Sequence, residues 1–281
     1  MEHWHCKQKA TTKRLMSMQN RSFSRTSSLN IWFGQHRRAA VVFFAIAGSI
    51  LAAATPSLAN SPPMEIHDRI AQNASAANNR VALTLDACGG AFDRELIEFL
   101  IRNRIPATLF ATKKWLDNNP LGVATVKAHL DLFDIEDHGE KHIPAVIGVG
   151  KKVYGIPGQP DLPHLRQEVL EGARAVERAT NVAAHWYRGA TAEYDQLAVA
   201  EIRNMGFKIA GFSVNADAGA TLKTPQIIDR LRHVQGGDVI IAHMNKPASD
   251  TAAGLTVGLA ELRQRGLVFV RLDNVELVET R

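Results

Sequence analysis

The chain has 281 residues and a formal net charge of +5. The first 59 residues hold eight of the 33 Lys and Arg residues but only one of the 28 Asp and Glu residues. The rest of the chain, with 25 basic and 27 acidic residues, is close to neutral, so its charge gives no support for nucleic-acid binding. Of the two cysteines, only Cys88 lies beyond residue 59, which excludes an intrachain disulfide once those residues are removed.

The N-terminal region has the pattern of a secretory signal. Two consecutive arginines precede an uncharged, apolar run over residues 39–60, and the small residues Ser57 and Ala59 stand near its end. A transmembrane anchor is the alternative, but the run is short of the ~20 apolar residues that a span needs and is broken by Pro56. We therefore expect residues 1–59 to be a basic leader and signal peptide and the protein to be exported, periplasmic or extracellular.

The part of the chain after the leader divides into two segments. Residues 60–79 have the composition of a linker followed by a weak helix. Residues 80–281 are rich in Ala, Val, Leu and Ile and are long enough to form one domain with a large core.

Strand-like and helical patterns alternate along this domain. Seven strand candidates cover residues 81–86, 106–112, 132–137, 183–188, 207–214, 237–243 and 267–272. Helical patterns cover residues 92–104, 119–130, 163–179, 193–206, 224–235 and 251–266. This alternation predicts parallel strands in a barrel or an open sheet. No GxGxxG or P-loop follows the first strand, which favours a barrel over a nucleotide-binding sheet.

Five charged or titratable residues stand at or just beyond the ends of different strand candidates. Asp86 ends the first, His138 follows the third, Arg188 ends the fourth, Asp217 lies just past the fifth and His243 ends the sixth. In a β/α barrel the chemistry takes place at the carboxyl ends of the strands. We therefore expect these side chains to meet in one pocket.

The segment "HGEKH" contains a candidate metal-binding pair. His138 and His142 are four residues apart, so on a helical turn they share a face and can bind one ion. Two solvated loop histidines would give the same pattern. The HExxH zinc-protease motif is excluded, because Gly139 stands where its glutamate is required. A metal site here needs a third ligand from elsewhere in the chain.

Five segments in order, "TLDACGG", "DHGEKH", "WYRGAT", "NADAG" and "VIIAHM", resemble the motifs of the polysaccharide deacetylases, carbohydrate esterase family 4. The resemblance covers residues 80–272. It implies a distorted (β/α) barrel with about seven parallel strands. It also implies a hydrolase that removes N-acetyl groups from an N-acetylated glycan with a divalent metal ion, for which zinc is the first expectation.

The resemblance also assigns roles to the motif residues. Asp86 corresponds to the general base and the two histidines of "HGEKH" to metal ligands. Arg188 and Asp217 would hold the base and the acid in place, and His243 would protonate the leaving amine. These residue types suit the reaction, since a carboxylate takes a proton from water and an imidazolium donates one to nitrogen.

The sequence departs from the family at Ala87, where a second aspartate usually binds the metal. Three replacements are open. Asp86 could turn toward the metal, Asp93 or Asp137 could substitute, or Cys88 could bind as thiolate. We expect Asp86 to be the ligand, because it already ends the strand.

Ala87 also motivates two other functions: a metal-independent amide hydrolase on the same fold, and a catalytically inactive relative that binds glycans. The expected partner in every case is a glycan or another amide substrate. We expect no nucleic acid, and a membrane only through an uncleaved leader.

Overall fold

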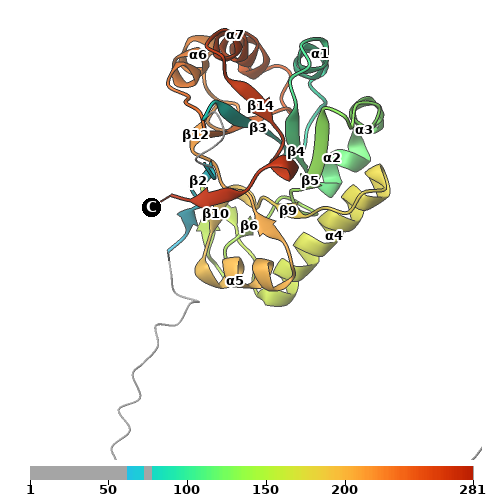
Figure 1. Ribbon diagram of the computed structural model, residues 1–281. Coiled ribbons are helices and arrows are strands. Elements are labelled where there is room, and N and C mark those ends of the chain that lie inside the picture. Colours follow the sequence, from blue (N-terminus) through green and yellow to red (C-terminus); the bar gives the residue numbers. More distant parts are fainter. Residues whose placement is uncertain (1–61, 73–77, 281) are drawn as a thin grey trace, which may run out of the picture. The chain divides into compact units, whose positions relative to one another are not determined.

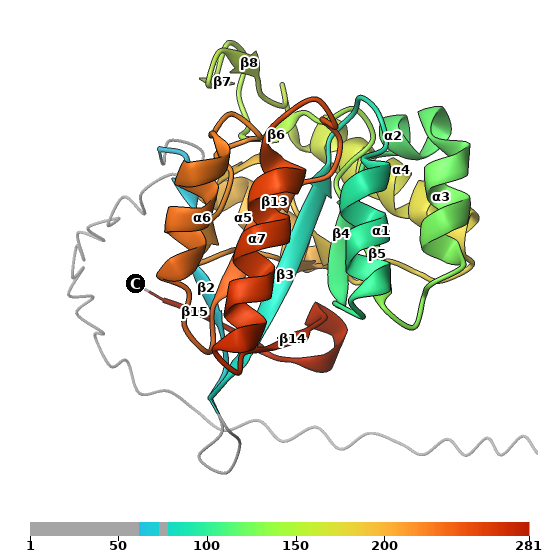
Figure 2. The same cartoon turned by 90° about the horizontal axis from the view of Figure 1, so that it is seen from above.

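A computed structural model describes residues 62–72 and 78–280 of the chain (Figure 1, Figure 2). The predicted leader, residues 1–59, lies outside the described residues and stays a prediction. Within the described ranges, no helix has the length and apolar character needed to cross a bilayer.

Seven parallel strands form a curled half-barrel sheet, which confirms the predicted fold class. Their order is β11-β9-β5-β4-β3-β13-β12, and an eighth strand, β14, pairs in parallel with the start of β3. The strands are β3 (Arg80–Ala87), β4 (Ala107–Ala111), β5 (Phe133–Asp137), β9 (Trp186–Tyr187), β11 (Lys208–Ile209), β12 (Val214–Asn215), β13 (Val239–His243) and β14 (Val268–Val270). Residues 81–87 of β3 are all buried, as expected for a strand covered on both faces.

The predicted strand over residues 207–214 is interrupted. β11 and β12 are separate strands, because the residues between them bond to the segment around β2: the Phe212 N–H donates to the Ile66 carbonyl, and the Phe212 carbonyl accepts from the Asp68 N–H. The approach is so close that a Cβ on Gly211 would lie 2.3 Å from the Ile66 carbonyl oxygen. One regular strand therefore cannot run through this position.

The helices surround the curled sheet (Figure 1). They are α1 (Arg94–Arg102), α2 (Lys113–Asn118), α3 (Pro120–Lys127), α4 (Leu162–Thr180), α5 (Gln196–Asn204), α6 (Thr224–Arg232) and α7 (Thr251–Gln264), with a short 3₁₀ helix at Leu272–Asn274. Side chains cap the starts of α1, α2, α4 and α5: Asp93, for example, accepts a hydrogen bond from Leu96 N–H at 3.1 Å. The predicted helix over residues 119–130 is preceded by a second one, because Thr112 caps α2.

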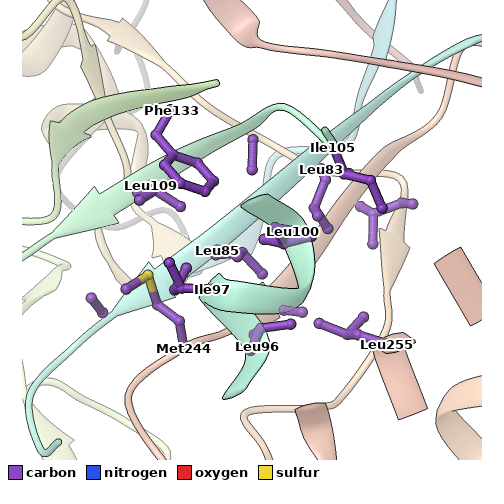
Figure 3. Close-up of a cluster of buried hydrophobic side chains, with 14 of the residues drawn as sticks. Leu83, Leu85, Leu96, Ile97, Leu100, Ile105, Leu109, Phe133, Met244 and Leu255 are labelled. Atoms are coloured by element: carbon purple, nitrogen blue, oxygen red, sulfur yellow. The ribbon is translucent and has the colours of Figure 1, made fainter. Parts of the chain in front are cut away.

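The two faces of the sheet carry different side chains. Leu83 and Leu85 of β3 face outward and pack against Leu96, Ile97 and Leu100 of α1 in the main core (Figure 3). The inner face is lined by a second apolar cluster, which includes Ala82, Phe110, Trp186, Val239 and Ile241.

Register places two of the predicted site residues in one row on the inner face. Asp86 of β3 lies directly opposite His243 of β13 on one side and Phe110 of β4 on the other. Phe110 in turn lies opposite Glu136 of β5. Because partners in parallel strands point to the same side, this row faces the interior of the half barrel.

The remaining strands are short and lie outside the main sheet. They are β1 (Met64–Glu65), β2 (Asp68–Ile70), β6 (Pro144–Ala145), β7 (Lys152–Val153), β8 (Ile156–Pro157), β10 (Ala190–Tyr194) and β15 (Leu277–Glu279). β1 pairs with β10, and β2 pairs with β15. The sequence predicts a linker and a weak helix for segment 60–79, but its described part forms two short strands that pair with the rest of the domain. The segment is ordered in this way because Ile66 and Ile70 are buried in the core.

Candidate active site

A cavity of about 620 Å³ opens at the carboxyl ends of β3 and β13. Asp86, His142 and His243 line it, and so does Cys88. Arg188, His138 and Asp217 lie directly behind these residues, through the contacts described below. A second cavity, of about 550 Å³, contains none of the predicted site residues. The structure thus brings together all six side chains that the sequence assigns to the site.

Asp86 is buried against the guanidinium of Arg188. The Asp86 Oδ1 atom accepts a hydrogen bond from Arg188 Nη1 at 2.9 Å, and Asp86 Oδ2 lies 3.7 Å from His138 Nε2. Arg188 also donates to the Thr84 hydroxyl and to the carbonyls of Ala210 and Gly211. The fully buried guanidinium is therefore surrounded by acceptors and holds the carboxylate in one orientation.

The charge on Asp86 follows from this contact. Burial raises the pKa of the carboxyl, but the cations of Arg188, His138 and His243 outweigh burial and lower the pKa below its usual value. Asp86 is therefore ionised at neutral pH and faces the cavity as a carboxylate.

His243 and Asp217 form the second buried pair. His243 Nδ1 lies 2.9 Å from Asp217 Oδ1, and Asp217 Oδ2 accepts hydrogen bonds from His243 N–H at 2.9 Å and from the Thr251 hydroxyl at 3.0 Å. Burial lowers the pKa of His243, but the hydrogen bond to Asp217 outweighs burial and holds that pKa well above its usual value. The imidazole is therefore protonated near neutral pH, and it also bonds the Cys88 sulfur, which lines the cavity beside it.

The two histidines of "HGEKH" lie side by side but not on a helix. Their ring centroids are 4.9 Å apart, and the segment between them is an irregular loop after β5. His138 Nδ1 donates to the Arg188 carbonyl at 2.6 Å, which leaves Nε2 facing the site. His142 has a left-handed backbone with a φ of 67°, a strained conformation for a residue with a Cβ.

A glutamate on α4 holds this loop in place. Glu168 Oε1 accepts hydrogen bonds from Lys141 N–H at 2.9 Å and from Ile143 N–H at 3.1 Å. The Glu168 carbonyl accepts from Glu140 N–H as well. Glu168 is not among the residues predicted from the sequence. The sequence feature that marks it is an acidic residue on the buried face of an amphipathic helix, between Leu165 and Val169.

Cys88 stands between the three imidazoles. Its Sγ atom lies 3.4 Å from His138 Nε2, and hydrogen bonds from His142 and His243 also reach the sulfur. Burial raises the pKa of the thiol, but the charge of His138 and these hydrogen bonds outweigh burial and hold the pKa well below its usual value. The donor atoms of Cys88, His138 and His142 all lie within 4.8 Å of one another.

Two of the other candidate ligands are engaged elsewhere. Asp93 caps α1. Asp137 accepts from Gly139 N–H, and its Oδ1 atom faces α4, where a Cβ on Gly172 would come within 2.0 Å of it. Neither belongs to the group of donor atoms around the two histidines.

Part of the cavity wall has an unusual backbone. Thr191, Ala192 and Ala218 line the cavity and have φ values of 68°, 55° and 47°. Such a conformation is strained for residues with a Cβ, and most of all for the β-branched threonine. Strain of this kind gathers at functional sites, which agrees with the placement of the polar groups.

By sequence, residues 73–210 match the polysaccharide deacetylase family. Among curated proteins no sequence matches this chain.

Solved structures of family 4 carbohydrate esterases resemble the fold. A pseudoenzyme of this family from Bacillus anthracis has a TM-score of 0.57 and 17% identity over 70% of this chain and 65% of its own, so the match spans about two thirds of that protein. A peptidoglycan N-acetylglucosamine deacetylase has a TM-score of 0.58 and 19% identity, over 70% of this chain and 87% of its own. PdaA of Bacillus subtilis, a family 4 carbohydrate esterase, has a TM-score of 0.56 and 16% identity, over 70% and 80%.

Proposed function

Because this chain belongs to the polysaccharide deacetylase family as a divergent member, we propose that it is an exported, metal-dependent hydrolase that removes N-acetyl groups from a glycan. The observation that carries this proposal is that two oppositely charged groups lie side by side in the wall of one cavity. Asp86, held by Arg188, and His243, held by Asp217, are direct neighbours on adjacent strands.

The cavity supports a glycan as the substrate. Its volume of about 620 Å³ lies within the roughly 300–1,000 Å³ of typical ligand sites. Tyr154, at the exposed turn between β7 and β8, also lines the cavity, and aromatic rings suit contact with sugars. Figure 2 shows this hairpin projecting beyond the helices. One structurally similar protein is a peptidoglycan N-acetylglucosamine deacetylase, so we test glycans of that sugar first.

The residues divide the reaction between them. Asp86 accepts a proton from the attacking water, whose oxygen forms the new bond to the acyl carbon. His243 donates its proton to the amide nitrogen as the carbon–nitrogen bond breaks, so that acetate and a free amine leave. Asp217 keeps His243 protonated and oriented. A divalent cation, when bound by the two histidines of "HGEKH", stabilises the negative charge that develops on the carbonyl oxygen.

The donor set fits such a cation. His138 presents Nε2 to the site because its Nδ1 atom is hydrogen-bonded to a carbonyl, which is the usual orientation of a metal-binding histidine. We propose zinc, in agreement with these nitrogen donors.

Acetate release from N-acetylglucosamine oligomers tests the proposal. We expect Asp86→Asn and His243→Ala each to abolish release, because each removes a group that exchanges a proton with the substrate or water. The exposed His233 at the end of α6 provides the matched control, and His233→Ala should release acetate at the normal rate. Normal rates in both site variants would reject the assignment.

Ala87 favours a second candidate function, an inactive relative that binds glycans without turnover. The same oligomers distinguish this second function from the deacetylase. Binding in a pull-down with no acetate released under any divalent cation would favour the second function, and release of acetate would exclude it.

A further inference from the structure

We propose that the Cys88 thiolate is the third protein ligand of the metal ion and takes the place of the carboxylate that Ala87 lacks. This inference rests on the metal dependence in the proposed function and replaces the expectation that Asp86 binds the metal.

The register of the sheet explains why the donor comes from position 88. Side chains alternate between the two faces of a strand. Asp86 faces the interior of the half barrel, and Ala87 faces outward, where it packs in the main core cluster. Ala87 pairs with Ala111, which pairs with Asp137, and Asp137 faces α4. The next residue, Cys88, returns to the inner side and lines the cavity with Asp86.

The spacing of the donor atoms fits a tetrahedral ion. With a Zn–S distance of about 2.3 Å and a Zn–N distance of about 2.0–2.1 Å, tetrahedral geometry places sulfur and nitrogen roughly 3.6 Å apart. The distance between Cys88 Sγ and His138 Nε2 is 3.4 Å. The donor atom of His142 lies within 4.8 Å of both. One small ion can therefore reach all three with little movement of the chain.

The backbone around the sulfur is fixed from two sides. The Thr112 hydroxyl donates to the Cys88 carbonyl at 3.0 Å, and the Asn245 side-chain amide donates to the Gly89 carbonyl at 2.5 Å. Gly90 has a φ of 83°, and a Cβ there would lie 2.6 Å from the Asn245 carbonyl oxygen. The two glycines after Cys88 thus allow a tight turn against the end of β13, and this turn aims the sulfur at the histidines.

Asp86 is left free for its role as base. Its Oδ1 atom is bound by Arg188, and its oxygens are not within the group of mutually close donors. Two imidazoles and a thiolate favour zinc or cobalt over magnesium or manganese, which prefer oxygen donors. Three protein ligands would leave a fourth position for water or substrate, as in catalytic zinc sites.

The same sulfur also touches His243, whose partner is Asp217. This arrangement offers a competing role, in which the thiolate attacks the acyl carbon. His243 would then donate its proton to the departing amine, and water would hydrolyse the thioester. The experiment must separate a ligand from a nucleophile.

The test uses the full chain loaded with Co²⁺ or Zn²⁺. We expect a sulfur-to-cobalt charge-transfer band in the near ultraviolet, and X-ray absorption of the zinc form should show sulfur at about 2.3 Å beside nitrogen at about 2.0–2.1 Å. Cys88→Ala should lose both signals and weaken metal binding by more than about tenfold. Cys88→Asp should keep the metal and lose the sulfur signals. Cys6→Ser is the matched control and should keep them.

Two results would overturn the inference. One is a metal bound with no sulfur signal in the unchanged protein. The other is an acyl group trapped on Cys88 in metal-free protein during turnover. Acetate release is measured separately, so the two proposals fail independently. A sulfur signal without acetate release would reject only the deacetylase activity, whereas acetate release with a sulfur-free metal would reject only the role of Cys88.

Discussion

At the scale of single residues, the Asp217 carboxylate controls the protonation of His243. A general acid works only while it is protonated, so the high pKa of His243 extends activity toward alkaline pH. In Asp217→Asn the hydrogen bond and the charge that raise this pKa are weakened. We expect the alkaline limb of the kcat/KM profile to move to lower pH and the rate to fall by about 10²–10⁴-fold.

Thr251→Ala serves as the comparison for this prediction. It removes one hydrogen bond to Asp217 but leaves the charge in place, so its alkaline limb should move less. An unchanged alkaline limb in Asp217→Asn would show that His243 is not the group that sets it.

Arg188 carries a buried positive charge, and its removal leaves the buried Asp86 carboxylate without its partner. In Arg188→Met the Asp86 carboxylate loses its main partner inside the protein, and breaking such a buried pair costs about 3–5 kcal/mol. We expect the free energy of unfolding, measured in urea, to fall by that amount.

The double variant Asp86→Asn/Arg188→Met checks the cause of this loss. It has no unpaired charge at this position, so it should be more stable than Arg188→Met alone. Equal stability of the two variants would contradict the assigned ion pair.

At the scale of elements, α4 holds the loop that carries His142. Glu168→Ala removes the acceptor of the Lys141 and Ile143 N–H groups and releases the strained backbone at His142. We expect zinc affinity to fall by about 10–100-fold, as is typical when a supporting partner of a metal ligand is lost. Isothermal titration measures the affinity. Glu177→Gln, an exposed position on the same helix, should leave it unchanged.

β5 carries a buried acid that makes stability depend on pH. Glu136 accepts hydrogen bonds from the N–H groups of His185 and Trp186. Burial, reinforced by the neighbouring Asp134, raises the pKa of Glu136 to about 8. The folded state therefore holds a proton that the unfolded state loses near pH 4.5, so this contribution to stability is full below that pH and is lost as pH rises toward 8.

The variant Glu136→Gln isolates this contribution, because it keeps an acceptor for the two N–H groups and cannot titrate. Urea unfolding at pH 5 and pH 8 should show a smaller loss of stability across this range in the variant. The same loss in both proteins would assign the pH dependence to other groups.

The elements also show what the sequence could predict. Runs of apolar residues identify strands such as β3 and β13, since a parallel strand that is buried on both faces consists almost entirely of apolar residues. The interruption between β11 and β12 depends on contact with Ile66, more than 140 positions away, and no local pattern contains that contact. The predicted site residues meet because parallel strands end at one rim. The nearness of Cys88 to the histidines depends on a turn held by Asn245, which the motif alone does not show.

At the scale of the whole described unit, β15 joins the last described residues to the first described segment, residues 62–72. Thr280 N–H donates to the His67 carbonyl at 2.7 Å, and Ala71 N–H donates to the Glu276 carbonyl at 2.8 Å. Deleting residues 277–281 removes this strand and exposes the edge of β2. We expect the thermal midpoint to fall by several degrees, at about 2–4 °C for each kcal/mol lost.

Val278→Thr is the matched control, because it changes an exposed side chain and keeps the main-chain hydrogen bonds. Its thermal midpoint should stay close to that of the unchanged protein. An unaltered midpoint in the deletion would mean that β15 contributes nothing to stability.

The antiparallel pairing of β2 with β15 has a consequence for engineering. Glu279 lies opposite Asp68, so in a shortened chain that begins at residue 62 a short peptide could connect the two ends, and new ends could be opened at a surface loop far from the cavity. Circular permutants of this kind should keep the pocket intact, since every strand that supplies a polar group would retain its neighbours.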